Sequence, residues 1–319
     1  MTHKLFKYLQ PLLFLGIGCL LLFFAFRGID LKNLQEVFKS IPLKWVFLSM
    51  LFGYLAFVFR GLRWHLLIKP LGFRPRLFDL INAIAFGYLF NSFIPRSGEI
   101  ARCTSLNKVS NIPVSKLLGH VILERLIDCV LLAICLFLAL VFNYQDFINF
   151  ASLFALPKHL FLYFICLILL LFLIYKFIQS FLSSSQLNKI SSFIQGIKLG
   201  FLSIQNISNK TLFCVYTILI WLCYLLMTVV CFYCFNETKD LNLGQGLFVM
   251  VAGGLGMVVP TPTGIGSYHY LVIQSLLAIN ITKEIAQFFA IIVHSSQAIM
   301  IMVAGFLAMI FLYRKKNKI

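Results

Sequence analysis

The chain has 319 residues and carries 27 Lys and Arg against 10 Asp and Glu, a formal net charge of +17. Hydrophobic residues make up 61% and charged residues only 12%, with a mean hydropathy of +0.95. Charged side chains are too few to solvate a globule of this size. These values exclude a water-soluble fold and predict an all-α, polytopic integral membrane protein with one domain over residues 1–319.

Six segments are apolar over enough residues to cross about 30 Å of hydrocarbon as a helix. In chain order they are residues 5–26, 45–67, 116–142, 160–182, 211–235 and 288–313. The first follows Lys4 and Lys7 as a signal peptide would, but no small-x-small cleavage site precedes Arg27. We therefore expect an uncleaved first span. Apolar residues also recur at helical spacing over residues 183–210, which predicts an amphipathic helix at the membrane interface.

Two further apolar segments are interrupted by proline, small polar residues and glycine, after which a helix resumes. The arms of the first cover residues 77–94 and 98–107, and those of the second cover 241–259 and 265–281. An opened backbone inside a bilayer persists only where protein or a water-filled cavity satisfies its polar groups. We therefore expect two re-entrant helical hairpins. If both arms of the second cross fully, the number of spans rises from six to eight.

The order span, span, hairpin, span occurs twice along the chain, the second time in the opposite orientation. This order fits an inverted-topology repeat with halves at residues 1–142 and 160–319. Paired broken helices in two such halves point to a substrate site near the membrane midplane.

The positive charge is distributed unevenly along this topology. With the N-terminus in the cytoplasm, most of the 27 Lys and Arg fall on the cytoplasmic side, including Arg60 and Arg63 at the inner end of the second span. Acidic residues show the opposite bias. This is the positive-inside pattern of an inner-membrane protein, not a nucleic-acid footprint. We expect a multi-pass cell-membrane protein with both termini in the cytoplasm.

The first break holds the residues best suited to a phosphate group. They are Pro95, Arg96, Ser97, Gly98, Glu99 and Arg102. Guanidinium groups bind phosphate oxygens bidentately, and the half-helix that follows the break offers free N–H groups. The alternative is an ordinary basic cytoplasmic loop followed by a capped helix.

A second set of polar residues lies inside the span at residues 116–142. His120, Glu124 and Asp128 are spaced i, i+4, i+8 and share one stripe, with Arg125 adjacent. Ionisable groups in a span are costly and often mark a pathway, which predicts a gating or coupling role. The alternative is a cluster of internal salt bridges that only orients helices.

The second break predicts the opposite wall of the same site. Hydroxyl groups and glycine-freed backbone come from Pro260, Thr261, Thr263, Gly264 and Gly266. His269 and His294 are candidates for proton coupling. The alternative is that each histidine is only hydrogen-bonded within the bundle.

Motifs of chemical catalysis are missing from the sequence. It contains no GxSxG, no phosphate-binding P-loop and no HExxH motif, and its nine cysteines are scattered without a metal-binding pattern. We expect no catalytic residue, no cofactor and no metal.

Three motifs occur in the order of a known family. They are Asn91-x3-Pro95-Arg96-x-Gly98-Glu99-x2-Arg102, Glu124-Arg125-x2-Asp128 and Pro260-x3-Gly264-x-Gly266. Over residues 7–315 the chain resembles the lysylphosphatidylglycerol synthase transmembrane-region family, flippase-like proteins that include the membrane half of the multiple peptide resistance factor. The resemblance implies an inner-membrane protein that moves an anionic, aminoacylated or polyprenyl-phosphate lipid between leaflets, with its polar site on these motif residues.

Two departures limit what the resemblance implies. Many members have an acid after the last glycine pair, whereas this chain has Ser267, Tyr268 and His269. The bifunctional members also continue into a soluble aminoacyl transferase, whereas this chain stops at Ile319, so we expect no synthase activity.

The sequence therefore predicts a lipid translocase whose partners are membrane lipids. Two alternatives stay open. One is a non-transporting membrane protein that presents a lipid carrier to a separate transferase partner, and the other is a proton-coupled carrier of small solutes.

Overall fold

The computed structural model describes residues 39–153 and 209–316, together with 16, 18–27, 169, 194–195, 198–199 and 201–207. Every regular element within these residues is helical, which confirms the all-α prediction. Most of the predicted span at 5–26, the span at 160–182 and most of the interfacial helix at 183–210 lie outside the described residues.

Four long helices form the frame of the molecule. They are α3 (Leu43–Ile68), α6 (Val114–Phe142), α10 (Lys210–Phe232) and α13 (Lys283–Lys316). Among the described residues, these four helices are long and apolar enough to cross a membrane, and they confirm four predicted spans. Large apolar side chains point outward from them, such as Phe47, Phe137 and Ile218, each more than 60% exposed. Such surfaces suit a lipid environment.

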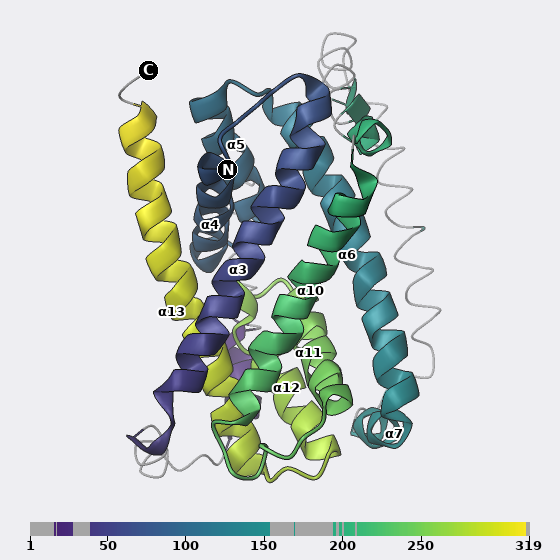
Figure 1. The fold of residues 1–319 in the computed structure, drawn as a ribbon. Helices are drawn as coiled ribbons and strands as arrows, with labels where there is room; N and C mark the ends of the chain where they lie inside the picture. The colour runs from purple at the N-terminus through teal and green to yellow at the C-terminus, as the bar shows by residue number, and fades with distance from the viewer. Residues whose placement is uncertain are drawn as a thin grey trace.

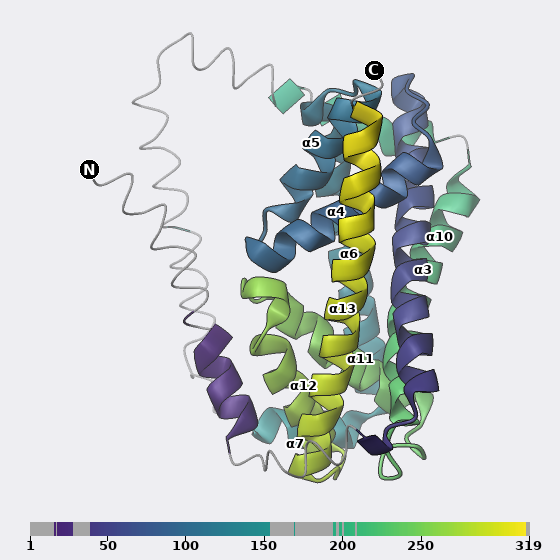
Figure 2. The same cartoon turned by 90° about the vertical axis from the view of Figure 1, so that its left-hand side faces the viewer.

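Two helical hairpins occupy opposite ends of this frame (Figures 1 and 2). The first consists of α4 (Leu77–Phe93) and α5 (Gly98–Ser110), and the second of α11 (Leu243–Val258) and α12 (Ser267–Ala278). Even the longest of these, α4 with 17 residues, rises only about 26 Å, short of about 30 Å of hydrocarbon. The structure confirms two broken helical hairpins with short arms, and the choice between six and eight spans stays a prediction.

Local sequence signals set several of the helix boundaries. Asn242 and Gln245 form a reciprocal capping box that begins α11, and the Asn209 side chain caps α10. Asn111 ends α5 in the left-handed conformation, two residues before Pro113 precedes α6. A short helix that the sequence did not predict, α7 (Tyr144–Ser152), follows α6 directly.

The helices pack as two units whose corresponding helices run in opposite directions. The first unit is α3, α4, α5 and α6, and the second is α10, α11, α12 and α13. Helix α3 packs on α10, while α4 packs on α13 and α11 packs on α6, so each hairpin contacts the last helix of the other unit. The long helices run in opposite directions in the two units (Figure 1). Each unit thus has the order span, hairpin, span, in opposite orientation, which agrees with the described part of the predicted inverted repeat. Most of the first span of each predicted half lies outside the described residues, so the halves stay a prediction.

Each hairpin has its own hydrophobic core. One core gathers residues of the first hairpin and its neighbours, such as Trp64, Leu80 and Leu106, while the other gathers Phe232, Val249 and Phe288 around the second hairpin. The two breaks lie close to each other between these cores. Helix α4, which leads into the first break, contacts the short 3₁₀ turn η3 (Pro262–Gly264) of the second break. Figure 2 shows the two hairpin tips facing each other near mid-height.

Close approach within the second hairpin depends on Gly256. A Cβ atom at this position would lie 2.7 Å from Tyr268 Cα and 2.8 Å from the Ser267 carbonyl oxygen. At Gly254, on the same helix, the nearest atom to an added Cβ is a flexible Leu132 methyl at 3.4 Å. Substitution of Gly254 is therefore a control for substitution of Gly256, because only at Gly256 would an added Cβ meet backbone atoms.

We predict that Gly256→Ala destabilises the protein by about 1–3 kcal/mol, the usual cost of overpacking. Gly254→Ala should be neutral or slightly stabilising, because Ala favours the helix more than Gly does. Unfolding in detergent micelles with increasing denaturant measures both changes. Equal stability of the two variants would contradict the tight packing of α11 on α12.

Candidate functional site

A network of ion pairs joins α3, α5 and α6 in the half of the molecule that holds the first hairpin. Its members are Arg60, Arg63, Glu99, Arg102, Glu124, Arg125 and Asp128. Helical spacing brings them together, because each helix contributes residues three or four positions apart that share one face. The structure thus assembles the predicted Glu124, Arg125 and Asp128 with Glu99 and Arg102 from the first break.

Glu124 lies at the centre of this network and is fully buried. Its Oε2 accepts a hydrogen bond from Arg102 Nη2 at 2.6 Å, and its Oε1 lies 3.8 Å from Arg63 Nη2. A buried carboxylate of this kind depends on its partners, since removing them leaves an uncompensated charge.

Asp128 closes the network toward α3 and α10. It accepts from Arg60 at 3.0 Å and from Arg63 at 3.2 Å, and Arg60 Nε also donates to the Tyr224 hydroxyl at 2.9 Å. Asp128 therefore links α6 to α3 directly and to α10 through Arg60.

The outer edge of the network is partly exposed. The side chains of Glu99 and Arg125 are 30% and 43% exposed, compared with 5% for Arg102. Glu99 pairs with Arg102 at 2.7 Å and with Arg125 at 3.4 Å, and Arg125 reaches Asp128 at 3.2 Å. This edge is the side from which a ligand or water can approach.

Positive charge is in excess in this network. Its four arginines face three carboxylates. Among the described residues, Arg60 Nη1 and Arg63 Nε have no hydrogen-bond partner, while Arg102 Nε and Arg125 Nε lie within ion-pair distance of Glu99. One acceptor, Glu124 Oε1, also lacks a hydrogen bond and lies 3.8 Å from Arg63. Buried donors without partners are costly and are usually satisfied by water or a ligand. The site therefore suits an anion better than a cation.

Sequence reasoning missed the two arginines of α3. It placed Arg60 and Arg63 at a cytoplasmic membrane interface, but they are 4% and 0% exposed and pair with the acids of α6. Their i, i+3 spacing inside an apolar helix was the available signal, because an acid in one span requires a cation nearby. Trp64, over whose ring the Arg102 guanidinium lies at 4.8 Å, completes this face of α3.

The first break presents Arg96 rather than Arg102 to its surroundings. Arg96 has a φ of 64° and is exposed, and its guanidinium donates a hydrogen bond to the Val258 carbonyl oxygen at the end of α11. Arg102 points instead into the ion-pair network and is buried. The two arginines predicted to share a phosphate are thus turned in different directions in this conformation.

The rest of the first break is fixed by its own backbone. The Asn91 side chain accepts from the Gly98 N–H at 2.7 Å, and the Ser97 hydroxyl donates to the Ile94 carbonyl at 2.7 Å. A Cβ on Gly98 would collide with the Gly87 carbonyl oxygen, so Gly98 allows α5 to pack on α4. Pro95 lies in the segment that these hydrogen bonds enclose.

The second break turns through left-handed backbone at Thr263, Gly264 and Gly266, with φ of 49°, 77° and 85°. The Thr261 hydroxyl lies 2.9 Å from the Ser267 hydroxyl, so the two sides of the turn are joined across it. Pro260 precedes this turn, as predicted. Residues 18–26, which are helical, cover it, because a Cβ on Gly266 would meet the Gly18 carbonyl oxygen.

The two predicted histidines lie together beneath the second break. Their ring centroids are 4.5 Å apart. His294 Nε2 lies 3.0 Å from the Thr263 carbonyl oxygen, and His269 Nδ1 accepts from the Gly266 N–H at 3.3 Å. Both histidines thus bind the backbone of the break. His120, in contrast, is fully buried on α6, and neither ring nitrogen has a hydrogen-bond partner among the described residues.

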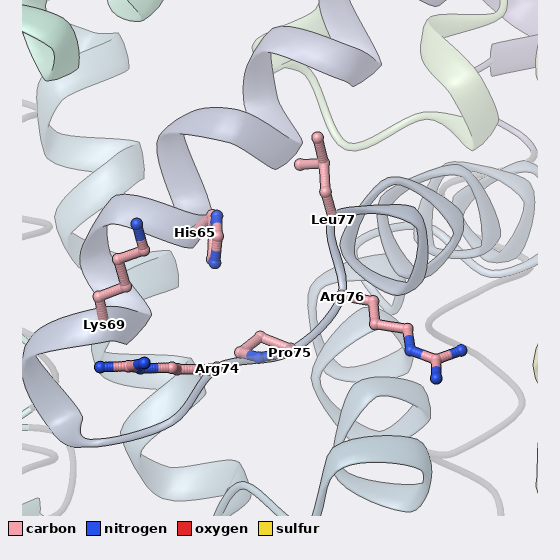
Figure 3. A pocket seen from close by; sticks show the side chains of 6 residues that line it. All are labelled: His65, Lys69, Arg74, Pro75, Arg76 and Leu77. Atoms are coloured by element: carbon pink, nitrogen blue, oxygen red, sulfur yellow. The ribbon is translucent and has the colours of Figure 1, made fainter.

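A basic recess of about 630 Å³ lies at the turn from α3 to α4. Its ionisable lining side chains are His65, Lys69, Arg74 and Arg76. Figure 3 shows His65, Lys69 and Arg74 gathered on one side, while Arg76 extends away on the other. Because no acid lines the recess, it favours an anion at this end of the bundle.

Comparison with known proteins identifies the family to which the chain belongs. The model of the lysylphosphatidylglycerol synthase transmembrane region matches residues 12–305. A UPF0104 membrane protein of Methanocaldococcus jannaschii is 25% identical over 96% of this chain and 96% of its own length. No solved structure matches the chain.

We predict that Glu124→Gln lowers the free energy of unfolding by about 3–5 kcal/mol, because it leaves Arg102 and Arg63 buried without their carboxylate. Glu99→Gln is the matched control. Its side chain is 30% exposed, Arg102 keeps Glu124 as a partner and Arg125 is 43% exposed, so the loss should be about 1 kcal/mol or less. Denaturant titration in detergent measures both. Equal losses would show that Glu124 is not the centre of the network.

Proposed function

The chain belongs to the family of the lysylphosphatidylglycerol synthase transmembrane region, and from this premise we propose that it moves a phosphate-bearing lipid between the leaflets of its membrane. The observation that carries the proposal is the hydrogen bond between the two breaks, from the Arg96 guanidinium to the Val258 carbonyl oxygen. It joins two hairpins that enter the bundle from opposite ends.

The short hairpins define the barrier to a lipid headgroup. In this proposal the four short arms, of 12 to 17 residues, do not cross the bilayer, so the tips alone separate the two ends of the bundle along this line. A headgroup that replaces the Val258 carbonyl as the partner of Arg96 would open this contact. Arg96 can bind a phosphate in this exchange, because the guanidinium prefers a charged oxygen to a neutral carbonyl.

The two breaks provide the other contacts for the phosphate in this proposal. Thr261, Thr263 and the glycine-freed backbone of Gly264 and Gly266 form the wall opposite Arg96. The Thr261 hydroxyl now lies 2.9 Å from the Ser267 hydroxyl, and the Thr263 hydroxyl donates to the Pro262 carbonyl at 2.7 Å. Such bonds can be exchanged for a headgroup without leaving a buried charge behind.

The ion-pair network has a separate role in the proposal. Arg102 and Glu124 hold α5 against α6, while Arg125, at the partly exposed edge, and its partner Asp128 respond to the approach of an anion. We propose transport without covalent chemistry, since the polar groups of the site are arranged as hydrogen-bond and charge partners.

We propose an inner-membrane orientation with the α3–α4 turn and the end of α13 toward the cytoplasm. The basic recess and the cations Lys108, Lys116 and Arg314 gather at that end, as the positive-inside rule requires. Anionic headgroups are attracted to such a surface by about 1 kcal/mol per Lys or Arg.

Replacement of Arg96 tests the proposal. We expect Arg96→Gly to slow the exchange of a fluorescent phosphatidylglycerol between leaflets of reconstituted vesicles by about tenfold or more, as for the loss of one charged hydrogen bond. Gly is the sharper variant because it adopts the left-handed backbone of Arg96 without strain. Lys239→Ala removes an exposed cation from the loop between α10 and α11, outside the breaks, the network and the recess, so this control should leave the rate unchanged.

The outcomes separate the open alternatives. If the wild type exchanges lipid no faster than empty vesicles, the translocase is rejected in favour of a protein that presents a lipid to a partner. If the wild type is active and Arg96→Gly is equally active, the proposed role of Arg96 is wrong.

A further inference from the structure

A groove of about 480 Å³ lies between α4, α5 and α13 and reaches the first break. These three helices pack on one another, with α13 beside the first hairpin (Figure 2). The volume falls within the range of about 300–1,000 Å³ that ligand pockets occupy. It belongs to neither the ion-pair network nor the basic recess.

One stripe of α5 forms the polar side of this groove. The lining residues Ser97, Ala101, Thr104, Ser105 and Lys108 recur at spacings of three and four, so they share one helix face. The opposite face carries Arg102, Cys103 and Leu106, which are buried in the network and core. Helix α5 therefore separates the groove from the ion pairs.

The hydroxyl groups on this stripe are oriented by their own helix. Thr104 donates to the Ala101 carbonyl at 3.1 Å, and Ser105 donates to the Arg102 carbonyl at 2.9 Å. Their oxygen atoms still have free lone pairs, and each hydroxyl can rotate toward another acceptor. Together with Lys108, they make a polar track in otherwise apolar surroundings.

The other walls of the groove are apolar. Phe86 and Phe90 come from α4, and Met309 and Leu312 come from α13. Phe90 and Met309 are 38% and 41% exposed, so these walls are open to the surroundings of the bundle. An amphipathic ligand can thus place its polar part on α5 and its apolar part on α4 and α13.

The length of the track matches half of a bilayer. From Ser97 to Lys108 the rise is about 17 Å at 1.5 Å per residue, compared with a hydrocarbon core of about 30 Å. Lys108 lies in the last turn of α5, and Ser97 lies beside Arg96 at the break. The track therefore leads from the basic end of the molecule to the point where the two hairpins meet.

We propose that this groove holds one membrane phospholipid, whose headgroup phosphate moves along the α5 stripe from Lys108 to Ser97 while an acyl chain lies against Phe86, Phe90, Met309 and Leu312. The inference rests on the proposed lipid translocation and adds the route and the class of lipid. Charge complementarity favours an anionic headgroup at the Lys108 end of the groove. Apart from Tyr313, Lys108 is the ionisable side chain in the lining.

Photo-crosslinking in reconstituted vesicles tests the route directly. Two phosphatidylglycerol probes are used, one with a photoreactive group on the glycerol headgroup and one with it at the acyl terminus. Peptide mapping should place the headgroup probe on α5 and the acyl probe on α4 and α13. Unlabelled phosphatidylglycerol should compete with both probes, whereas inorganic phosphate should not.

Two variants and two controls make the experiment specific. Lys108→Gln should lower headgroup labelling by about fivefold, in line with the attraction of one near-surface cation for an anionic headgroup. Thr104→Trp should block labelling by filling the groove. Lys210→Gln removes a cation at the same end, and Ile218→Trp adds a bulky residue on the exposed face of α10, so both should label as the wild type does.

The outcomes distinguish this inference from the translocase itself. Labelling of α5, α4 and α13 without lipid exchange supports the groove and rejects translocation. Lipid exchange with labelling confined to other helices, or labelling that Lys108→Gln leaves unchanged, overturns the groove. A crosslink between two copies of the chain at this face would identify it as a dimer surface and would also overturn it.

Discussion

The burial of Glu124 is the constraint on which the first half of the molecule depends. Removing a carboxylate from water costs several kcal/mol, and only well-placed partners offset this cost. Here Arg102 on α5 and Arg63 on α3 supply these partners, so one charge fixes three helices relative to one another. The hairpin of α4 and α5 is too short to be held by a full crossing of the membrane. Its position is therefore set by this charge, by the close packing of Gly87 on Gly98 and by its own core.

The two hairpins are held in place by different kinds of interaction. The first is held by ion pairs that a change of charge can weaken. The second has no acid or arginine at its break and is held by hydrogen bonds from His294 and between Thr261 and Ser267, and by the close approach of Gly256 to Tyr268. The first hairpin is thus the one whose contacts depend on charge, and the second the one whose contacts do not. A binding anion would act on the first hairpin, because its network already has more positive than negative groups.

Sequence patterns predicted the features that depend on local signals. Apolar length identified α3, α6, α10 and α13, and proline with glycine identified both breaks. The stripe of Glu124 and Asp128 was also visible, because ionisable residues inside a span are rare. What the sequence could not supply was the pairing across helices. From the sequence we interpreted Arg60 and Arg63 as cations of the membrane interface and Arg102 as a phosphate ligand. A linear pattern does not show which carboxylate of another helix lies next to each arginine. Likewise, Tyr224 looks like any aromatic residue of a span until α10 packs on α3 and brings its hydroxyl to Arg60.

The different contacts of Arg96 and Arg102 follow from their positions relative to α5. Arg96 lies just before this helix in left-handed backbone, while Arg102 lies one turn inside it on the face toward α6. An arginine held by two carboxylates cannot release its guanidinium to a ligand without leaving Glu124 uncompensated. Arg96 binds only a neutral carbonyl, which solvent or the bundle can satisfy otherwise. Of the two, Arg96 is therefore the arginine that can exchange partners in the transport that we propose, and Arg102 is the one whose ion pairs hold α5 against α6.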